Sequence, residues 1–482
     1  MKQSSTLAVL IFGLAYGAAA GEPAVGNWPQ FRGDNASGLA AGAKPPVKFG
    51  PGDGMLWSVE VPWSPSSPCV WGGRIFLTTF NDGQLETRCH DAADGKLRWA
   101  RGIKPASLED FHRSDGSPAA SSPATDGQRV VSYFGSFGLV CHDLDGKELW
   151  RHPLPVALSM GQYGSGTSPI IVDGRVILNR DQHSFSTLLA LDVKTGKQLW
   201  ETPRTDSPGS FGTPVWWRNN GTDEIVVAAM GRIRGYDLKT GAERWSVDGI
   251  TGLVCTTPVV ADGRLYFAAF SNASADAPLG TWEEFLKQND KNGDGEVTFD
   301  ELPAQARDYV RGLDVNRDGK ITKEDWALRE ARMAHCENLL VAVKPGGTGD
   351  ITKTHVAWTF RKGLPYVPSP LEYEGRIYFV KDGGMMTCLD AKTGAPFYTQ
   401  ERLGAESGYY ASPVAADGRI YVASLAGKVS VVKAGGDKPE VLHQVDFGDR
   451  ILATPALSGD RLYLRTAKKL WAFGPQGNAA PR

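Results

Sequence analysis

A motif that recurs eight times constrains the fold of this chain more than any other feature of its sequence. Each copy places a serine, threonine or alanine before a proline, and a glycine and an aromatic or aliphatic residue come a few positions later. The anchoring prolines are Pro68, Pro123, Pro169, Pro214, Pro258, Pro370, Pro413 and Pro455. They are separated by 55, 46, 45, 44, 112, 43 and 42 residues, so one unit repeats and only the fifth gap contains an insertion. A repeat of this length indicates a fold built from eight similar units.

Most anchors are followed by a second signature, Asp-x-x-x-Gly-Lys-x-x-Trp or a close variant. Copies lie at 91–99, 143–150, 192–200 and 237–245, and a degraded copy lies at 390–398. The turn glycine supplies the positive φ that a short hairpin needs, and the flanking residues alternate between apolar and polar as strands do. With its anchor segment, each signature predicts one four-stranded blade of a β-propeller. We interpret the recurring tryptophans as core residues that pack one blade against the next.

The two ends of the repeat region predict how the ring closes. After Pro455 the sequence contains only three strand patterns, the last at 469–473. A spare segment at 55–61, MLWSVEV, precedes the first anchor and copies the Leu-x-Trp pattern of the outer strands. A ring with an open edge would expose unpaired backbone groups, so we expect Trp57 and its strand to complete the eighth blade. The predicted fold is an all-β, eight-bladed propeller closed by an N-terminal strand.

The composition agrees with this fold and excludes some partners. The 482 residues are 41% apolar and include 57 glycines and 30 prolines, which suits a large core with many turns. The formal net charge is only -2, so the whole molecule has no field that would attract nucleic acid or anionic lipid. The six cysteines are scattered singly and are predicted to be buried thiols rather than a disulfide framework. They are Cys69, Cys89, Cys141, Cys255, Cys336 and Cys388.

The first residues have the anatomy of a secretory signal. Lys2 precedes an apolar run at 7–16, and three consecutive alanines end at Ala20. The run is shorter than the roughly 20 apolar residues that a membrane-spanning helix needs. We therefore expect a signal peptide at 1–20 that is cleaved after Ala20, and a periplasmic or secreted protein without a transmembrane segment.

The repeats and their signatures resemble those of the pyrroloquinoline-quinone-like propeller family. The resemblance runs from Trp28 to Gly474, apart from the insertion. The opening NWPQFRG at 27–33 is also similar to the start of many exported bacterial members, most of which have no assigned biochemical role. The resemblance implies a propeller in two parts, at 27–271 and 338–474, on either side of an insertion at 272–337.

The insertion in blade five has a different character from the repeats. Apolar residues at spacings of three and four near 282–286 and 326–331 predict two helices. The first loop between them, at 290–301, matches D-x-[DN]-x-[DN]-G-x5-E, the pattern of a calcium-binding EF-hand, with Gly295 at the sharp turn. Calcium prefers six to eight oxygen ligands. The predicted ligands are the carbonyl of Glu296, a water held by Thr298, and the side chains of Asp290, Asn292, Asp294 and Glu301.

A second loop follows the same pattern but ends in aspartate instead of glutamate. Its predicted ligands are Asp314, Asn316, Asp318, the carbonyl of Lys320, and Asp325. The shorter side chain of Asp325 is less able to reach an ion with both oxygens, which weakens Ca²⁺ binding relative to Mg²⁺. We predict two unequal sites, and the alternative that the second loop is vestigial stays open.

The two loops are predicted to form one compact pair. Val297 and Ile321 hold equivalent positions after the loop glycines, and in EF-hand proteins such residues pair as a short two-stranded bridge. Residues 302–313 leave room for one helix, which must serve as the exit of the first loop and the entry of the second. The acidic ligands would repel one another without metal, so we expect the unit to become ordered on metal binding.

The insertion is expected to share a face of the propeller with the channel mouth. In an up-and-down blade, the connection between strands two and three leaves on the same rim as the connections between blades, which include the long segment 102–120. Candidates for a protein or small-molecule site there are His112, Arg113, Asp115, Tyr163, Tyr366, Tyr409 and Tyr410. Polar loop residues on a rigid scaffold often bind ligands, and the alternative is that these residues only cap the channel.

Two functions are consistent with these patterns. One is a monomeric, non-catalytic scaffold or binding protein of the exported space, similar in architecture to the propeller that helps assemble outer-membrane proteins. The other, implied by the family resemblance, is an alcohol or sugar dehydrogenase that uses pyrroloquinoline quinone with a catalytic aspartate and Ca²⁺. Such enzymes resemble longer chains with an adjacent cysteine pair, and this sequence has no such pair. We therefore favour the scaffold, do not expect a bound quinone, and assign no catalytic residue.

Overall fold

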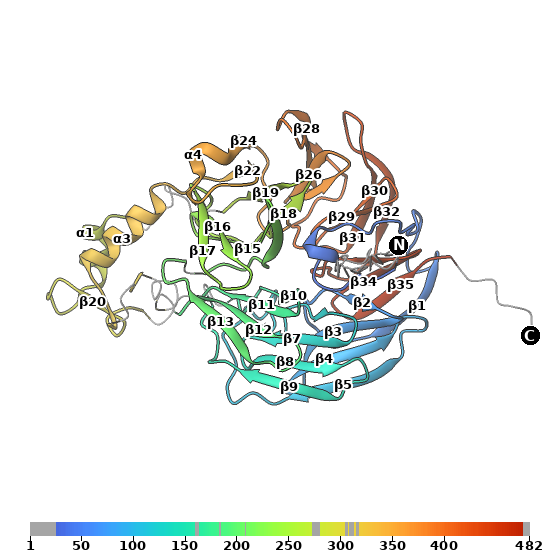
Figure 1. Ribbon diagram of the computed structural model, residues 1–482, viewed down its shortest axis with the longest axis horizontal. Coiled ribbons are helices and arrows are strands. Elements are labelled where there is room, and N and C mark those ends of the chain that lie inside the picture. Colours follow the sequence, from blue (N-terminus) through green and yellow to red (C-terminus); the bar gives the residue numbers. More distant parts are fainter. Residues whose placement is uncertain are drawn as a thin grey trace, which may run out of the picture.

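The eight proline-anchored units fold into eight antiparallel sheets that are arranged as the blades of a ring (Figure 1). The computed structural model describes residues 26–159, 163–182, 185–207, 209–271, 280–303, 307, 313–314 and 318–475. The predicted signal peptide and most of the helix expected at 302–313 therefore lie outside the described residues. Each blade runs from an innermost strand at its proline to an outermost strand, so the predicted eight-bladed propeller is confirmed.

Blades one to four follow one another without interruption. Blade one contains β2 (Cys69–Trp71), β3 (Arg74–Asn81), β4 (Gln84–Asp91) and β5 (Leu97–Ile103). Blade two contains β6 (Ala124–Thr125), β7 (Arg129–Phe134), β8 (Gly138–Asp143) and β9 (Glu148–Pro153). Blade three contains β10 (Ile170–Val172), β11 (Arg175–Arg180), β12 (Thr187–Asp192) and β13 (Gln198–Pro203). Blade four contains β14 (Val215–Asn219), β15 (Thr222–Ala229), β16 (Arg232–Asp237) and β17 (Glu243–Asp248).

Blade five is interrupted between its second and third strands, as the repeat spacing predicts. It contains β18 (Val259–Ala261), β19 (Arg264–Ala269), β22 (Leu339–Val343) and β24 (Val356–Phe360). Blade six contains β25 (Leu371–Tyr373), β26 (Arg376–Lys381), β27 (Met385–Asp390) and β28 (Pro396–Arg402). Blade seven contains β29 (Val414–Ala416), β30 (Arg419–Ala423), β31 (Lys428–Lys433) and β32 (Glu440–Asp446).

The eighth blade joins the two ends of the propeller. Its inner strands are β33 (Ala456–Ser458), β34 (Arg461–Arg465) and β35 (Lys469–Phe473), and its outermost strand is β1 (Met55–Glu60). β1 pairs antiparallel with β35, and Trp57 stands opposite Ala472. The ring is therefore closed by the N-terminal strand, as predicted.

Outer-strand tryptophans join neighbouring blades, which confirms their interpretation as packing residues. The Nε1 group of Trp99 donates to the carbonyl of Leu144 at 3.0 Å, and that of Trp150 donates to Val193 at 3.0 Å. The turn glycine of the next blade lies against each ring. An added Cβ at Gly146, where φ is 86°, would come within 2.6 Å of the Trp99 ring. The close approach and the positive φ together require glycine at this position of the signature.

Blade four has a fifth strand that the repeat pattern does not predict. β23 (Gly349–Asp350) pairs in parallel with β17, with Trp245 opposite Gly349. A short helix, α4 (Thr352–His355), then leads into β24. The connection between β22 and β24 therefore lies against the neighbouring blade instead of forming a tight hairpin, which explains why blade five has no copy of the second signature.

Residues 26–43 cross one end of the ring before the first strand begins. Trp28 forms a bridge with Val70 of blade one, and Leu39 forms a bridge with Ala415 of blade seven. Between them lies the short 3-10 helix η1 (Asp34–Ala36), where the Asn35 amide donates to the carbonyl of Trp216 in blade four at 2.8 Å. These contacts with blades on different sides of the ring place the segment across its centre (Figure 1). It lies at the end beside the first hairpin of each blade, opposite the end from which the insertion leaves.

The insertion is a small unit with its own apolar core, and it projects away from the ring (Figure 1). It contains α1 (Trp282–Asn289), β20 (Val297–Thr298), β21 (Lys320–Ile321) and α3 (Lys323–Met333). Val297 pairs with Ile321, which confirms the predicted bridge. Its buried core consists of Trp282, Phe285, Val297, Leu302, Leu313, Ile321 and Trp326. At its base, the Asn338 side chain donates to the carbonyl of Ser271 and accepts from its N–H, both at 2.9 Å, so the two stems are held together.

All six cysteines are free thiols, five of them buried and Cys255 half-buried. The prediction that they form no disulfide framework is confirmed. Within the described residues, no helix is long and apolar enough to cross a membrane.

Candidate functional site

A closed belt of hydrogen bonds surrounds the central channel. It is made by the Ser or Thr that precedes each anchoring proline, and each hydroxyl accepts the backbone N–H of the equivalent residue in the preceding blade. The eight distances lie between 2.9 and 3.2 Å, and the last bond, from the Thr454 N–H to the Ser67 hydroxyl, completes the circle. The belt residues are Ser67, Ser122, Ser168, Thr213, Thr257, Ser369, Ser412 and Thr454. Because every blade contributes one donor and one acceptor, the belt links all eight innermost strands.

The belt lines a cavity of about 230 Å³ on the ring axis. Phe31 of the N-terminal segment also lines it, so the segment that crosses the ring forms part of its wall. The remaining apolar and aromatic lining includes Tyr163, Phe211, Leu253, Tyr366, Tyr410 and Leu452. Concave, mostly apolar cavities with a few convergent polar groups are the usual form of small-molecule sites.

Four of the seven rim candidates line this cavity: Asp115, Tyr163, Tyr366 and Tyr410. The other three lie outside its lining. His112 is exposed and stacks on Tyr163 with ring centroids 5.9 Å apart, and Arg113 is exposed. Tyr409 is buried inside the blade, where its hydroxyl donates to the carbonyl of Ala405 at 2.8 Å.

An ion pair fastens segment 102–120 over the channel mouth. The Arg450 guanidinium, from the connection into blade eight, pairs with the carboxylate of Asp115 and donates to the carbonyl of Ser114 at 2.9 Å. Partial burial opposes ionisation of Asp115, but the hydrogen bond and charge of Arg450 outweigh it and lower the pKa of this carboxyl. Asp115 is thus an anion that already has a partner.

Three other titratable groups of the cavity, Cys255, Tyr366 and Tyr410, are neutral at physiological pH. Burial raises the pKa of the Cys255 thiol and of the Tyr410 phenol to about 12 in each case, and it also raises the pKa of Tyr366. These groups therefore keep their protons and are available as hydrogen-bond donors. A high pKa also means that Cys255 is a poor nucleophile, because the reactive form of cysteine is the thiolate.

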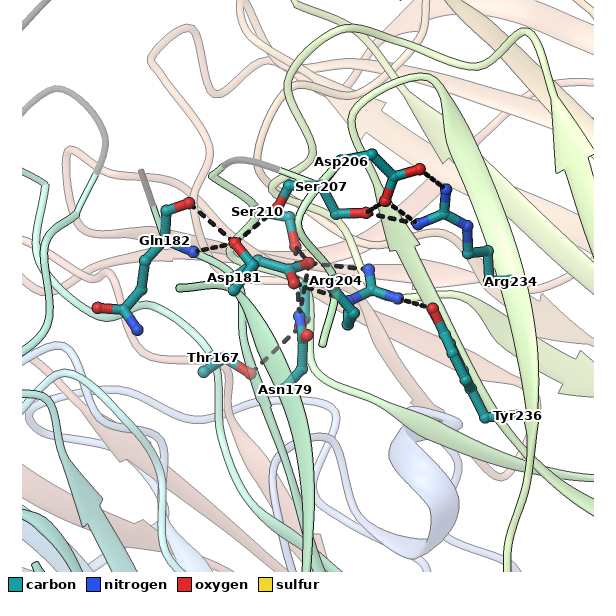
Figure 2. Close-up of polar contacts among 12 residues, drawn as sticks. Thr167, Asn179, Asp181, Gln182, Arg204, Asp206, Ser207, Ser210, Arg234 and Tyr236 are labelled. Atoms are coloured by element: carbon teal, nitrogen blue, oxygen red, sulfur yellow. Dashed lines mark hydrogen bonds and ion pairs between the residues drawn. The ribbon is translucent and has the colours of Figure 1, made fainter. Parts of the chain in front are cut away.

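A buried polar cluster lies between blades three and four (Figure 2). The Arg204 guanidinium forms two hydrogen bonds to Asp181, at 2.7 and 3.0 Å, and a third to the Tyr236 hydroxyl. Both side chains of the ion pair are almost completely buried. Ser210 donates to the same carboxylate at 2.8 Å, so the cluster connects strand ends from two blades. Ser210 directly precedes Phe211 of the cavity lining, so the cluster can help to hold the cavity wall.

Glu109 is another buried residue with a titratable side chain, and the sequence analysis does not identify it as a candidate. Its Oε2 accepts from the Ser165 hydroxyl at 2.7 Å, and Oε1 is buried without a hydrogen-bond partner in the described part of the chain. Burial raises the pKa of Glu109 to about 8, so the neutral form prevails at pH 7. Because the folded state then binds a proton that the unfolded state releases, this residue makes folding less favourable as pH rises toward 8.

The first predicted metal loop is held by hydrogen bonds from its own backbone. The Asp290 carboxylate accepts from the N–H groups of Gly293 and Gly295, at 2.7 and 3.0 Å. The Glu301 carboxylate accepts from the N–H and the hydroxyl of Thr298, both at 2.8 Å. These bonds lower the pKa of Glu301 to about 2, so this carboxylate is ionised at any physiological pH.

The second loop is organised in a similar way and is tied to the first. Asp314 accepts from the N–H of Gly319 at 3.0 Å, and Asp325 accepts from the Thr322 hydroxyl at 2.8 Å. The Lys320 ammonium forms an ion pair of 2.5 Å with the Glu296 side chain of the first loop. Asn316 lies outside the described residues. Within the described chain, no group of three His, Cys, Asp or Glu side chains has an arrangement that could hold a metal ion, so both metal sites remain predictions.

Comparison with known families decides the affiliation of the chain. The sequence model of the family described as outer membrane protein assembly factor BamB matches residues 81–295 and 306–477. The chain belongs to this family. No curated protein matches the sequence.

Solved structures similar to this chain include BamB from Moraxella catarrhalis, with 12% sequence identity, a TM-score of 0.53, and coverage of 89% of this chain and 99% of that one. The computationally designed Ika8 protein has 12% identity, a TM-score of 0.54, and coverage of 87% and 99%. A quinohemoprotein alcohol dehydrogenase from Pseudomonas putida HK5 has 15% identity, a TM-score of 0.43, and coverage of 95% and 82%. The BamB and Ika8 likenesses support the propeller fold and nothing more specific.

The roles of several site residues cannot be predicted from the sequence. The sequence pattern includes the belt residues as the Ser or Thr before each anchoring proline. A local pattern does not show, however, that their hydroxyls accept hydrogen bonds from the preceding blade. Arg204, Asp181 and Glu109 occur in loops without a motif, and only their burial and partners distinguish them.

Proposed function

We propose that this member of the BamB family is an exported, calcium-binding scaffold that binds a partner through the rim bearing the insertion and catalyses no reaction. The family description names an assembly factor for outer-membrane proteins, which supports a scaffold role. The observation that carries the proposal is the inserted unit, which has its own core and two loops rich in oxygen ligands on the face that also contains the channel mouth. Such a rim offers a second contact surface beside the channel.

The residues of the insertion are suited to a hard cation. Asp290, Asn292, Asp294 and Glu301 would hold Ca²⁺ in the first loop, with Glu296 contributing its carbonyl. Asp314, Asn316, Asp318, Lys320 and Asp325 would hold Ca²⁺ or Mg²⁺ in the second loop. All of these groups offer oxygen, the ligand type that both ions prefer. A bound ion would neutralise the loop carboxylates and stabilise the unit for partner binding.

Calorimetric titration of the purified protein with Ca²⁺ tests the metal proposal. We expect binding with a dissociation constant on the order of micromolar or weaker at the first loop, and preferential loss of this site in Glu301→Gln, because the substitution removes one charged ligand oxygen. Asp300→Asn is the matched control, since the neighbouring Asp300 side chain is 97% exposed and is not a predicted ligand. Heat signals that are equal in the wild type and Glu301→Gln would contradict the assignment of the first loop. Both variants should keep a folded propeller.

Reconstitution with pyrroloquinoline quinone tests the non-catalytic part of the proposal. The chain has no adjacent cysteine pair, and its predicted calcium ligands lie in the insertion rather than in the ring. We therefore expect no bound quinone chromophore after gel filtration and no dye-linked oxidation of alcohols. A stoichiometric chromophore together with turnover would show that the protein is a dehydrogenase.

A further inference from the structure

We propose that the central cavity binds a small organic anion, with a carboxylate group held at the hydroxyl belt and an apolar body packed against the aromatic wall. This inference goes beyond the scaffold proposal and does not depend on the metal loops. It rests on the hydroxyl protons of the belt, on one buried cation beside it, and on a mostly apolar lining whose described carboxylate is already paired.

The belt leaves eight hydroxyl protons without an acceptor. A hydroxyl has one proton to donate and two lone pairs that accept. Each belt oxygen accepts the N–H of the preceding blade, and within the described chain none of the eight protons has an acceptor. All eight residues are more than nine-tenths buried and all line the cavity. Because these hydroxyls line the cavity, their protons can be donated to an acceptor-rich group on the axis.

Arg32 places a positive charge next to this ring. Its Nη2 group donates at 2.7 Å to the carbonyl of Pro370, the residue that directly follows Ser369 of the belt. The side chain is fully buried, and its Nε and Nη1 groups have no hydrogen-bond partner in the described residues. Burial lowers the pKa of Arg32 to about 9, so it remains charged at pH 7. A buried guanidinium without a carboxylate partner favours an anion nearby.

The rest of the lining selects for an apolar body and against a cation. Tyr163, Phe211 and Leu253 contribute aromatic and aliphatic surface. Burial keeps Cys255, Tyr366 and Tyr410 neutral, because it raises the pKa of each. Asp115 is the one carboxylate among the described residues of the cavity lining, and its charge is paired with Arg450. Among the described lining residues, a positively charged ligand therefore finds no unpaired anion, whereas a carboxylate finds hydroxyl donors. Arg32 is not itself in the lining, but it contacts Pro370 directly beside the belt.

Benzoate is a suitable probe, because it joins one carboxylate to one apolar ring. We expect calorimetry or ligand-observed NMR to show that benzoate binds about tenfold more tightly than benzyl alcohol, which has the ring without the charge, and than acetate, which has the charge without the ring. Benzylamine should not bind. Equal affinity for benzoate and benzyl alcohol, or no binding of benzoate, would overturn the proposal.

Two variants locate the site. Arg32→Met should weaken benzoate about tenfold while leaving benzyl alcohol unchanged, because it removes the charge and keeps the apolar volume. Leu253→Trp should abolish binding of both by filling the cavity, and Leu149→Trp, at a side chain of blade two that is 42% exposed, is the matched control. If Arg32→Met does not fold, Leu253→Trp decides alone: benzoate binding that survives this substitution contradicts the proposed site. The Ca²⁺ titration is independent of these results, so failure here leaves the scaffold proposal standing.

Discussion

Replacing Trp57 with alanine should destabilise the propeller by about 3–5 kcal/mol, the cost of truncating a large buried aromatic side chain. Trp57 closes the ring, and only 8% of its surface is exposed. Its Nε1 group donates to the carbonyl of Ala92 in blade one at 3.2 Å, and the turn at Gly95 packs on its ring. The substitution therefore weakens the one junction at which the two ends of the repeat region meet. Urea denaturation followed by tryptophan fluorescence and circular dichroism measures this loss.

Two further variants separate closure from ordinary packing. Deleting Met55–Glu60 removes β1 and leaves β35 as an unpaired edge, so we expect aggregation in addition to lower stability. Leu149→Ala changes an exposed side chain of an equivalent outer strand in blade two, and it should cost less than about 0.5 kcal/mol. A Trp57→Ala protein as stable as the Leu149→Ala protein would mean that the N-terminal strand does not hold the ring together.

Most of the propeller can be predicted from the sequence because its determinants are local. Prolines fix the start of each inner strand, and glycines with positive φ fix the hairpins, so the period alone indicates eight blades. The closing role of β1 follows from counting strands at the two ends. The fold of 26–43 does not, because it has no strand periodicity and its position depends on bridges such as that between Leu39 and Ala415. β23 is equally unpredictable, since its partner is the edge of a different blade.

The sequence predicts only part of the candidate site. Tyr409 and Tyr410 are adjacent, yet the first points into its blade and the second lines the cavity. In an irregular connection no periodicity tells which of two neighbours faces a channel. Glycine and acidic spacing identify the metal loops by pattern alone, whereas the donor belt becomes visible only when the hydrogen bonds between blades are traced. Arg32 shows the same limit, because an arginine beside a turn is ordinary in sequence and unusual only when it is buried without a carboxylate.

Asp181→Asn should cost about 3–5 kcal/mol, since it leaves the Arg204 guanidinium buried without a counter-charge. The pair is 0% and 1% exposed, and the carboxylate also accepts from Ser210. In the wild type, burial by itself opposes the charge of Arg204, but the attraction of Asp181 outweighs it and raises the pKa of the guanidinium. Asp181→Asn removes this attraction and leaves the burial that opposes the charge, which is the source of the expected cost. Urea denaturation at pH 7 measures the loss.

Two comparisons show whether the cost arises from the buried charge. The exposed ion pair between Arg74 and Asp145, in which Asp145 is 82% exposed, provides a matched control, and Asp145→Asn should cost between about 0 and 1 kcal/mol. Removing both charges of the buried pair, in Asp181→Leu with Arg204→Met, should recover part of the stability that Asp181→Asn loses, because an apolar pair of similar volume carries no desolvation penalty. If the double variant is less stable than Asp181→Asn, the hydrogen bonds to Ser210 and Tyr236 contribute more than the ion pair, and the cluster holds the cavity wall through its polar network rather than through its charges.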